Sequence, residues 1–204
     1  MTMDNTMNRL DAPATASLQN TFDLVSVDLA QDVITFWRDV GKEGWFAKND
    51  AVDQRFRDLF YDLHFSAARR ECEHWIAQPY PGLALILLLD QFPRNVFRQT
   101  AHMFATDPLA RHYAKRFIDD GLVDQLDNEL RLFACLPFVH SENLSDHDYA
   151  LKLYQRYAPG NLGWAQNHRS IVSRFGCFPH RNASLGRATT PEQQAFLDEG
   201  GFAG

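Results

Sequence analysis

Two similar motifs, far apart in the sequence, carry the side chains best suited to chemistry. They read Phe92-Pro93-Arg94-Asn95 and Phe178-Pro179-His180-Arg181-Asn182. Each follows an apolar stretch with helical spacing, and each brings together an aromatic ring, a proline, a guanidinium and an amide. Proline removes a backbone donor and usually ends a helix. We therefore predict that two helix ends meet and present arginine and asparagine to one place.

The second motif lies in a segment of unusual charge. Between residues 166 and 190 there is no acidic residue, but there are four arginines and two histidines: Arg169, Arg174, Arg181, Arg187, His168 and His180. Guanidinium groups bind carboxylate and phosphate in a bidentate way. A loop interrupted by glycine and proline contributes to binding more often than a helix does. We predict that Arg181 and Arg187 clamp an anion, that Asn182 orients it, and that His180 can transfer a proton.

Together, the motifs predict a pocket for a small anionic ligand, a carboxylate or a phosphate, in a protein that could be an enzyme. A purely structural polar network remains the alternative. The sequence does not identify a reaction or a catalytic residue. The predicted ligand-binding residues are Arg94, Asn95, His140, His180, Arg181, Asn182 and Arg187.

Asp90 directly follows seven apolar residues, 83–89, so we predict that its carboxylate is buried. A buried carboxylate must be paired, or it becomes protonated. Its partner could be Arg94, Arg174 or Arg181. We favour a structural ion-pair network made of Asp90, Glu142 and Arg174, since such networks are common in folded proteins. A role for Asp90 as general base or ligand anchor remains the alternative.

His140-Ser141-Glu142 offers a histidine, a hydroxyl and a carboxylate in consecutive positions. Neighbouring side chains usually diverge, and no G-x-S-x-G motif is present, so a serine hydrolase is not indicated. His140 and Glu142 could bind a metal only with His168 or His180 from another segment, and their spacing is not typical of helical metal sites. We predict no metal and no cofactor, because P-loop and dinucleotide glycine motifs are also missing.

Two other groups of residues are interpreted as core. His168 shares a helical stripe with Ile171, Val172 and Phe175, which favours a core histidine. The aromatic pairs Phe36-Trp37 and Trp45-Phe46 are also most simply core.

Composition narrows the class of protein. The chain has 204 residues, 45% hydrophobic, with a net charge of −6, which argues against nucleic-acid and anionic-membrane partners. Three cysteines without paired spacing fit free thiols in a reducing compartment. The longest apolar run, 83–89, is too short to cross a bilayer, and the N-terminus shows no signal-peptide pattern. We therefore expect a cytoplasmic protein; the sequence leaves its oligomeric state open.

Hydrophobic spacing predicts helices along most of the chain. We expect a disordered or loosely attached tail over residues 1–23 and a single helical domain over 24–204. The predicted helices are 27–40 ended by Gly41, 50–75 capped by Asp50, a central buried helix around 83–89 ended by Pro93, 107–120 with Asp107 as N-cap, 127–136, 145–157 capped by Ser145, 161–175 closed by Gly176, and a last helix opened by the capping box 190–193.

These elements, about eight helices without a convincing strand, predict an all-α fold. Helices paired as antiparallel hairpins every thirty to forty residues suggest a hairpin stack, and a compact helical array fits nearly as well.

Four longer phrases resemble one bacterial family, catalogued as domain of unknown function 924. They are Leu87 to Asn95, Phe104-Ala105-Thr106-Asp107-Pro108, residues 136–142, and residues 174–182 with Leu185-Gly186-Arg187. The resemblance covers about residues 33–197 and implies a tetratricopeptide-like (TPR-like) α-α superhelix. It implies no catalytic residues, because none is established for the family. The resemblance also leads us to expect arginine where this chain has Cys177, so a site that needs charge there would be weakened.

The TPR-like resemblance implies a second function, an interaction scaffold that binds proteins or acidic peptides in an open groove without catalysis. We favour the small-ligand pocket, because the distinctive polar residues lie at helix ends and in loops rather than on repeated helix faces.

Overall fold

The computed structural model describes residues 25–204, so the predicted tail over residues 1–23 lies outside the described part of the chain. Within residues 25–204 the chain is helical and has no strand, which confirms the all-α prediction; the TPR-like arrangement stays a prediction. The α-helices are α1 (Asp28–Trp45), α2 (Asp50–Ala68), α3 (Pro79–Val96), α4 (His102–Ala105), α5 (Asp107–Asp119), α6 (Arg131–Val139), α7 (Leu144–Tyr157), α8 (Leu162–Phe175) and α9 (Pro191–Asp198). Short 3₁₀ turns join them: η1 (Glu73–Ala77), η2 (Leu122–Gln125), η3 (Pro159–Asn161) and η4 (Pro179–Arg181). No helix in this region is both long and apolar enough to span a membrane.

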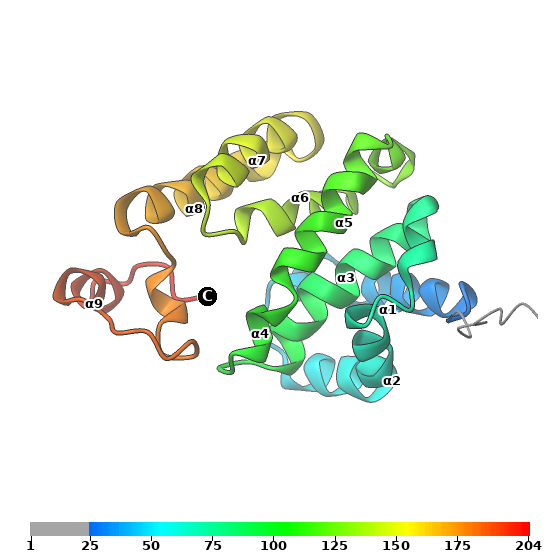
Figure 1. The fold of residues 1–204 in the computed structure, drawn as a ribbon, viewed down its shortest axis with the longest axis horizontal. Helices are drawn as coiled ribbons and strands as arrows, with labels where there is room; N and C mark the ends of the chain where they lie inside the picture. The colour runs from blue at the N-terminus through cyan, green and yellow to red at the C-terminus, as the bar shows by residue number, and fades with distance from the viewer. Residues whose placement is uncertain (1–24) are drawn as a thin grey trace, which may run out of the picture.

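Helix α3 lies at the centre of the first six helices (Figure 1). It packs against α1, α2, α5 and α6. Every residue from 83 to 89 is 0% exposed. A helix that is apolar all round must be covered on every side. This burial confirms the predicted central helix and fixes the position of the residues that follow it.

Pro93 does not end α3, contrary to the prediction; the helix continues to Val96. A proline inside a helix leaves the carbonyl four residues earlier without its N–H partner. Here that carbonyl belongs to Leu89, and the Thr106 hydroxyl donates a hydrogen bond to it at 2.5 Å. A side chain from the next segment thus replaces the missing donor. As a result, Arg94 and Asn95 lie in the last turn of a continuous helix.

We expect Thr106→Val to lower the free energy of unfolding by about 1–3 kcal/mol, because it leaves the buried Leu89 carbonyl unpaired. Thr100→Val is a matched control, since the Thr100 hydroxyl donates to Phe97 in an exposed turn; surface changes of this kind cost less than about 0.5 kcal/mol. Urea denaturation measures both. Equal small effects would mean that Thr106 does not stabilise the Pro93 turn.

Several helix boundaries differ from the predictions. Helix α1 bends at Gly41, where φ is +66°, and then resumes as far as Trp45. Helix α2 ends at Ala68 rather than near residue 75. Leu59 of α2 is 54% exposed, so not every apolar residue of this helix faces the core. The Gly176 ending of α8 and the Thr190 capping box of α9 are confirmed.

Asparagine, rather than the predicted residues, caps α2 and α7. The Asn49 side chain accepts hydrogen bonds from two backbone N–H groups at the start of α2. The Asn143 side chain accepts one from the backbone N–H of Ser145 at the start of α7. A carboxamide oxygen just before a helix satisfies its free N–H groups as well as aspartate or serine does. Asp50 and Ser145 therefore lie inside their helices.

The C-terminal part faces α3 across the molecule. Helices α7 and α8 pack together, and the chain then turns through η4 towards α9 (Figure 1). A second, smaller apolar cluster forms from Ile171, Val172 and Phe178, with Phe175, Phe196 and Phe202 against it. This cluster holds the second motif opposite the end of α3.

Candidate ligand-binding site

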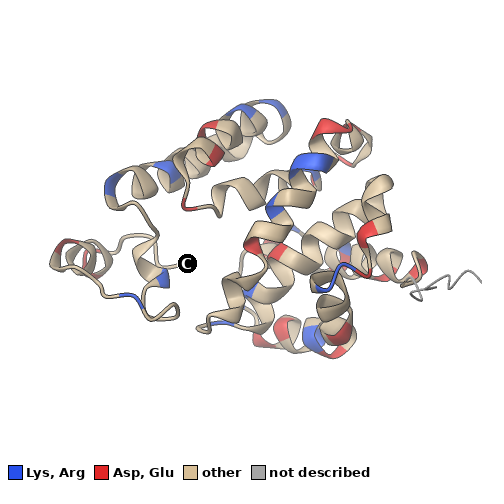
Figure 2. Ribbon diagram, viewed as in Figure 1, with Lys and Arg blue, Asp and Glu red and all other residues tan. Residues whose placement is uncertain are grey.

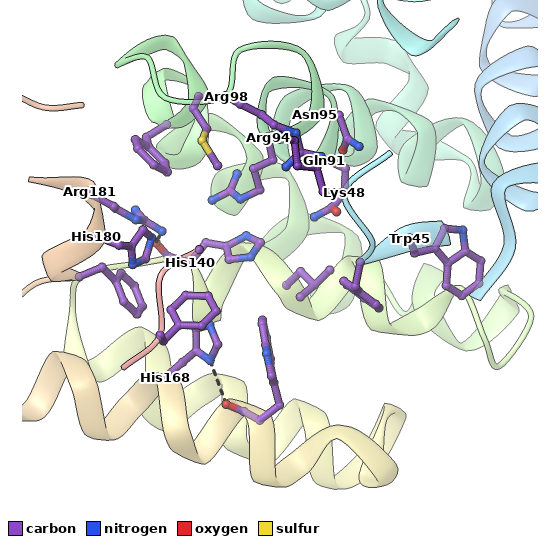
Figure 3. Close-up of a pocket in the computed structure, with 18 of the residues that line it drawn as sticks. Trp45, Lys48, Gln91, Arg94, Asn95, Arg98, His140, His168, His180 and Arg181 are labelled. Atoms are coloured by element: carbon purple, nitrogen blue, oxygen red, sulfur yellow. Dashed lines mark hydrogen bonds between the residues drawn. The ribbon is translucent and has the colours of Figure 1, made fainter. Parts of the chain in front are cut away.

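A cavity of about 450 Å³ lies where the two motifs meet. Its walls come from the end of α1 and the loop after it, the end of α3, α4, α6, α7, η3, α8, η4 and the last residues of the chain. Figure 3 shows Arg94, His140, His180 and Arg181 around this space. The size suits a small molecule.

Arg94 and Arg181 share one carboxylate, that of Asp107. Arg94 binds it in a bidentate way, with N–O distances of 2.8 and 3.0 Å. Arg181 Nη1 approaches the second oxygen at 3.3 Å. Asp107 was predicted to cap α5, but its side chain makes no capping bond and turns to the arginines instead. The two motifs therefore converge on a residue that we had not placed in the site.

The Arg181 guanidinium is enclosed on both sides. Its Cζ lies 4.5 Å from the ring centroid of Phe104 and 4.6 Å from that of Phe178. Burial lowers the pKa of Arg181 to about 10, despite the attraction of Asp107. Its Nε is buried and has no partner in the described part of the chain. Arg181 thus remains a buried cation with unused donor capacity.

Asp90 is buried, and both oxygens of its carboxylate have hydrogen-bond partners. Its carboxylate accepts hydrogen bonds from Gln91 at 2.5 Å and from His140 Nδ1 at 2.8 Å, and Arg94 lies 3.3 Å away. Burial opposes ionisation, but Arg94 and His140 outweigh it and lower the pKa of Asp90 to about 2. Burial and Arg94 also lower the pKa of His140, against the attraction of Asp90. Asp90 is therefore an anion beside a neutral imidazole.

His168 and His180 form the opposite wall together with Phe202. The His168 ring centroid lies 3.7 Å from Trp164 and 4.3 Å from Phe202, and that of His180 lies 5.0 Å from Phe202. Burial lowers the pKa of both histidines to about 3. His168 Nδ1 bonds the Trp164 carbonyl, drawn as the dashed line in Figure 3. Both rings are therefore neutral at ordinary pH.

Basic side chains line the cavity, and the acidic side chains that pair with them lie outside its lining. The charged side chains that line it are Lys48, Arg94, Arg98 and Arg181, and no Asp or Glu is among the described lining residues. Arg98 is held from behind by Asp53 at 2.7 Å. Figure 2 shows that acidic and basic residues are mixed over the first helices, whereas the segment between α8 and α9 carries only basic ones.

Five of the seven predicted binding residues line the cavity: Arg94, Asn95, His140, His180 and Arg181. Asn182 and Arg187 do not. Asn182 is buried and donates to Gln193 of α9 at 3.1 Å. Arg187 grips Glu142 in a bidentate way, at 2.7 and 2.9 Å. The predicted clamp of Arg181 with Arg187 is therefore wrong, because Arg187 is already paired within the protein.

The predicted structural network is only partly found. Asp90 pairs with Arg94, and Glu142 pairs with Arg187. Arg174 belongs to neither pair, because it binds Glu192 of α9 at the surface, where its side chain is 54% exposed. Its position on the outer face of α8 places it away from Asp90.

The sequence reasoning missed several residues of the cavity: Arg98, Trp164, His168 and Phe202. The spacing of four between Arg94 and Arg98 was a usable signal for the first of these. His168 had been interpreted as a core histidine, and its buried position agrees, but its ring also lines the cavity. Phe46, also interpreted as core, is 58% exposed at the cavity edge, whereas Trp45 is buried.

Two further points concern metal and thiol chemistry. Among residues 25–204, no cluster of three or more His, Cys, Asp or Glu side chains is arranged to hold a metal ion.

Cys177 does not line the cavity; its sulfur accepts a hydrogen bond from Gln193 at 3.5 Å. The cysteine at this position therefore takes no charge from the cavity wall.

Comparison with known proteins finds a matching family and a similar structure, but both are described as being of unknown function. Residues 33–201 match the family described as "Bacterial protein of unknown function (DUF924)". A solved structure from Agrobacterium tumefaciens, the protein of unknown function ATU0120, is similar with a TM-score of 0.83. It shares 48% sequence identity, and the match covers 86% of this chain and 100% of that chain. No curated protein matches.

Proposed function

The chain belongs to the bacterial DUF924 family, and we propose that it binds a small anionic ligand, a carboxylate or phosphate of metabolite size, in the cavity beside Arg94 and Arg181. The family carries no assigned activity, so the proposal rests on the geometry of the cavity.

The proposal depends mainly on the burial of Arg181 and its incomplete pairing with Asp107. Arg181 is 6% exposed, and its contact with Asp107 is long at 3.3 Å. Burial outweighs the attraction of the carboxylate and lowers the pKa of Arg181. A buried cation with incomplete compensation gains from a second anion. A ligand carboxylate or phosphate would supply the partner that the protein leaves out.

The remaining walls suit such a ligand. Arg94 uses both terminal nitrogens on Asp107, so a guanidinium with five N–H groups retains donors for the cavity. Trp164, Phe104 and Phe178 offer aromatic surface for an apolar body. This combination of few polar groups and an apolar wall is typical of small-molecule sites.

The alternative of an interaction scaffold has less support. A scaffold would present its polar residues along an open groove on helix faces. Here four polar residues of the two motifs, Arg94, Asn95, His180 and Arg181, line a cavity whose walls come from many separate segments of the chain.

A thermal-shift screen tests the proposal. Inorganic phosphate and a set of small mono- and dicarboxylates are the probes. At a concentration one hundred times its Kd, a ligand stabilises the folded state by about 2.7 kcal/mol, which raises Tm by about 5–10 °C for a chain of this size. Arg181→Met should abolish the shift, while circular dichroism shows that the variant remains folded, because Asp107 keeps its bidentate bond to Arg94.

Arg174→Met is the matched control, because it removes an arginine that pairs at the surface. It should shift with the same ligands as the unmodified protein. Identical ligand responses in the Arg181 and Arg174 variants would rule out the cavity as the anion site.

A further inference from the structure

The His140 ring is fixed with one nitrogen inward and the other free. Nδ1 lies 2.8 Å from Asp90 Oδ1. An ionised carboxylate can only accept, so Nδ1 must carry the hydrogen. In a neutral imidazole the lone pair then lies on Nε2. The partner thus sets the tautomer of His140.

His140 Nε2 has no protein partner in the described part of the chain, and it is not among the buried unpaired nitrogens. His140 lines the cavity, and Figure 3 shows its ring projecting into that space. His147 and His168 also pair only one ring nitrogen, but their second nitrogens are buried, whereas that of His140 is not. The lone pair of His140 instead faces the cavity.

The ring is also held rigidly. Gln91 and Arg94 fix the Asp90 carboxylate from other directions. The His140 carbonyl accepts a hydrogen bond from Arg181 Nη2 at 2.9 Å. One arginine of the proposed anion site is therefore bonded directly to the residue that carries the free lone pair. A base positioned by a third group is a recurring feature of catalytic sites.

We infer that His140 is a general base, positioned by Asp90, that removes a proton from the ligand held beside Arg94 and Arg181. The inference rests on the proposed anion site and adds a reaction to it. The substrate class that fits is a small oxo acid: its carboxylate meets the arginines, and its acidic hydrogen is on the carbon next to the carbonyl.

The step is a simple proton transfer. His140 Nε2 takes the hydrogen, and the electrons of the broken C–H bond remain on the ligand as an enolate. The arginines stabilise this new negative charge. The imidazolium that forms lies next to the ionised Asp90, which compensates its charge. Return of a proton from solvent-exchanged His140 completes an exchange cycle that needs no other reactant.

Hydrogen exchange in D₂O tests the inference. Pyruvate and 2-oxobutyrate are incubated with the protein, and loss of the C3 proton signals is followed by NMR. We expect exchange above the buffer rate, reduced at least about 100-fold in His140→Gln. Asp90→Asn keeps an acceptor for Nδ1–H but removes the charge, so the apparent pKa in its pH–rate profile should fall. His112→Gln, on the exposed face of α5, should exchange at the unmodified rate.

The outcomes separate the two proposals. If the oxo acids raise Tm but no His140-dependent exchange occurs, the base is wrong and the anion site stands. If no anion raises Tm in the unmodified protein, the site itself is wrong. Exchange that survives in His140→Gln, with Tm shifts intact, would also overturn the assignment of the base.

Discussion

Asp107→Asn should lower the free energy of unfolding by about 3–5 kcal/mol, the cost typical of removing one partner from a buried ion pair. Arg94 and Arg181 would both lose their shared carboxylate, and both guanidinium groups are nearly buried. Asparagine has almost the same shape, so the loss comes from charge rather than from packing. Urea or guanidinium denaturation at neutral pH measures the effect.

Asp148→Asn is the matched control, because it removes the same charge from a pair with Arg169 that lies at the surface. Exposed pairs of this kind contribute less than about 1 kcal/mol. The contrast between the two variants isolates burial as the cause. Similar small losses would mean that a single charge at Asp107 does not hold the two motifs together.

A steep loss of stability in mild acid is the second large expected effect. Burial lowers the pKa of His64 to about 4, and lowers those of His168 and His180 to about 3. The unfolded chain binds protons at these residues near pH 6.5, whereas the folded chain does not. Stability is therefore full above pH 6.5 and falls as pH drops towards 4. Three such residues give a slope of about 2–4 kcal/mol per pH unit.

Chemical denaturation at a series of pH values between 5 and 7.5 measures this slope. His168→Gln should remove about one proton from the uptake on unfolding, and His112→Gln should leave it unchanged. The Asp90 carboxylate acts at lower pH, because its stabilising effect is lost only as pH falls from 3.8 towards 2. A flat profile down to pH 5 would show that these imidazoles are protonated in the folded protein.

Local sequence signals predicted most of the fold. The apolar run 83–89 identified the central helix, and the capping box at Thr190 identified the start of the last one. The prediction failed at Pro93, because the rule that proline ends a helix considers only the helix itself. Thr106, thirteen residues later, supplies the missing donor. Such rescue depends on tertiary contact, and no local pattern reveals it.

The candidate site was harder to predict for the same reason. The repeated Phe-Pro motifs pointed to Arg94 and Arg181, which the structure brings to one carboxylate. The sequence could not show that Asp107 would be that carboxylate, since Asp-Pro at a helix start looks like a cap. Nor could it show that Glu142 would take Arg187 away from the cavity. Residue types suggested the chemistry, but pairing partners decided which groups stay free.

The walls of the cavity come from distant parts of the chain, from Trp45 to Gly204. A ligand that binds both Arg94 and Arg181 would link α3 to η4, and so connect the first helices to the C-terminal part of the chain. Occupancy should therefore slow protease cleavage of the α8–α9 connection, which carries Arg181. Two fragments of the chain that are mixed but do not reassemble into the fold should show no such protection, because the cavity is then not formed.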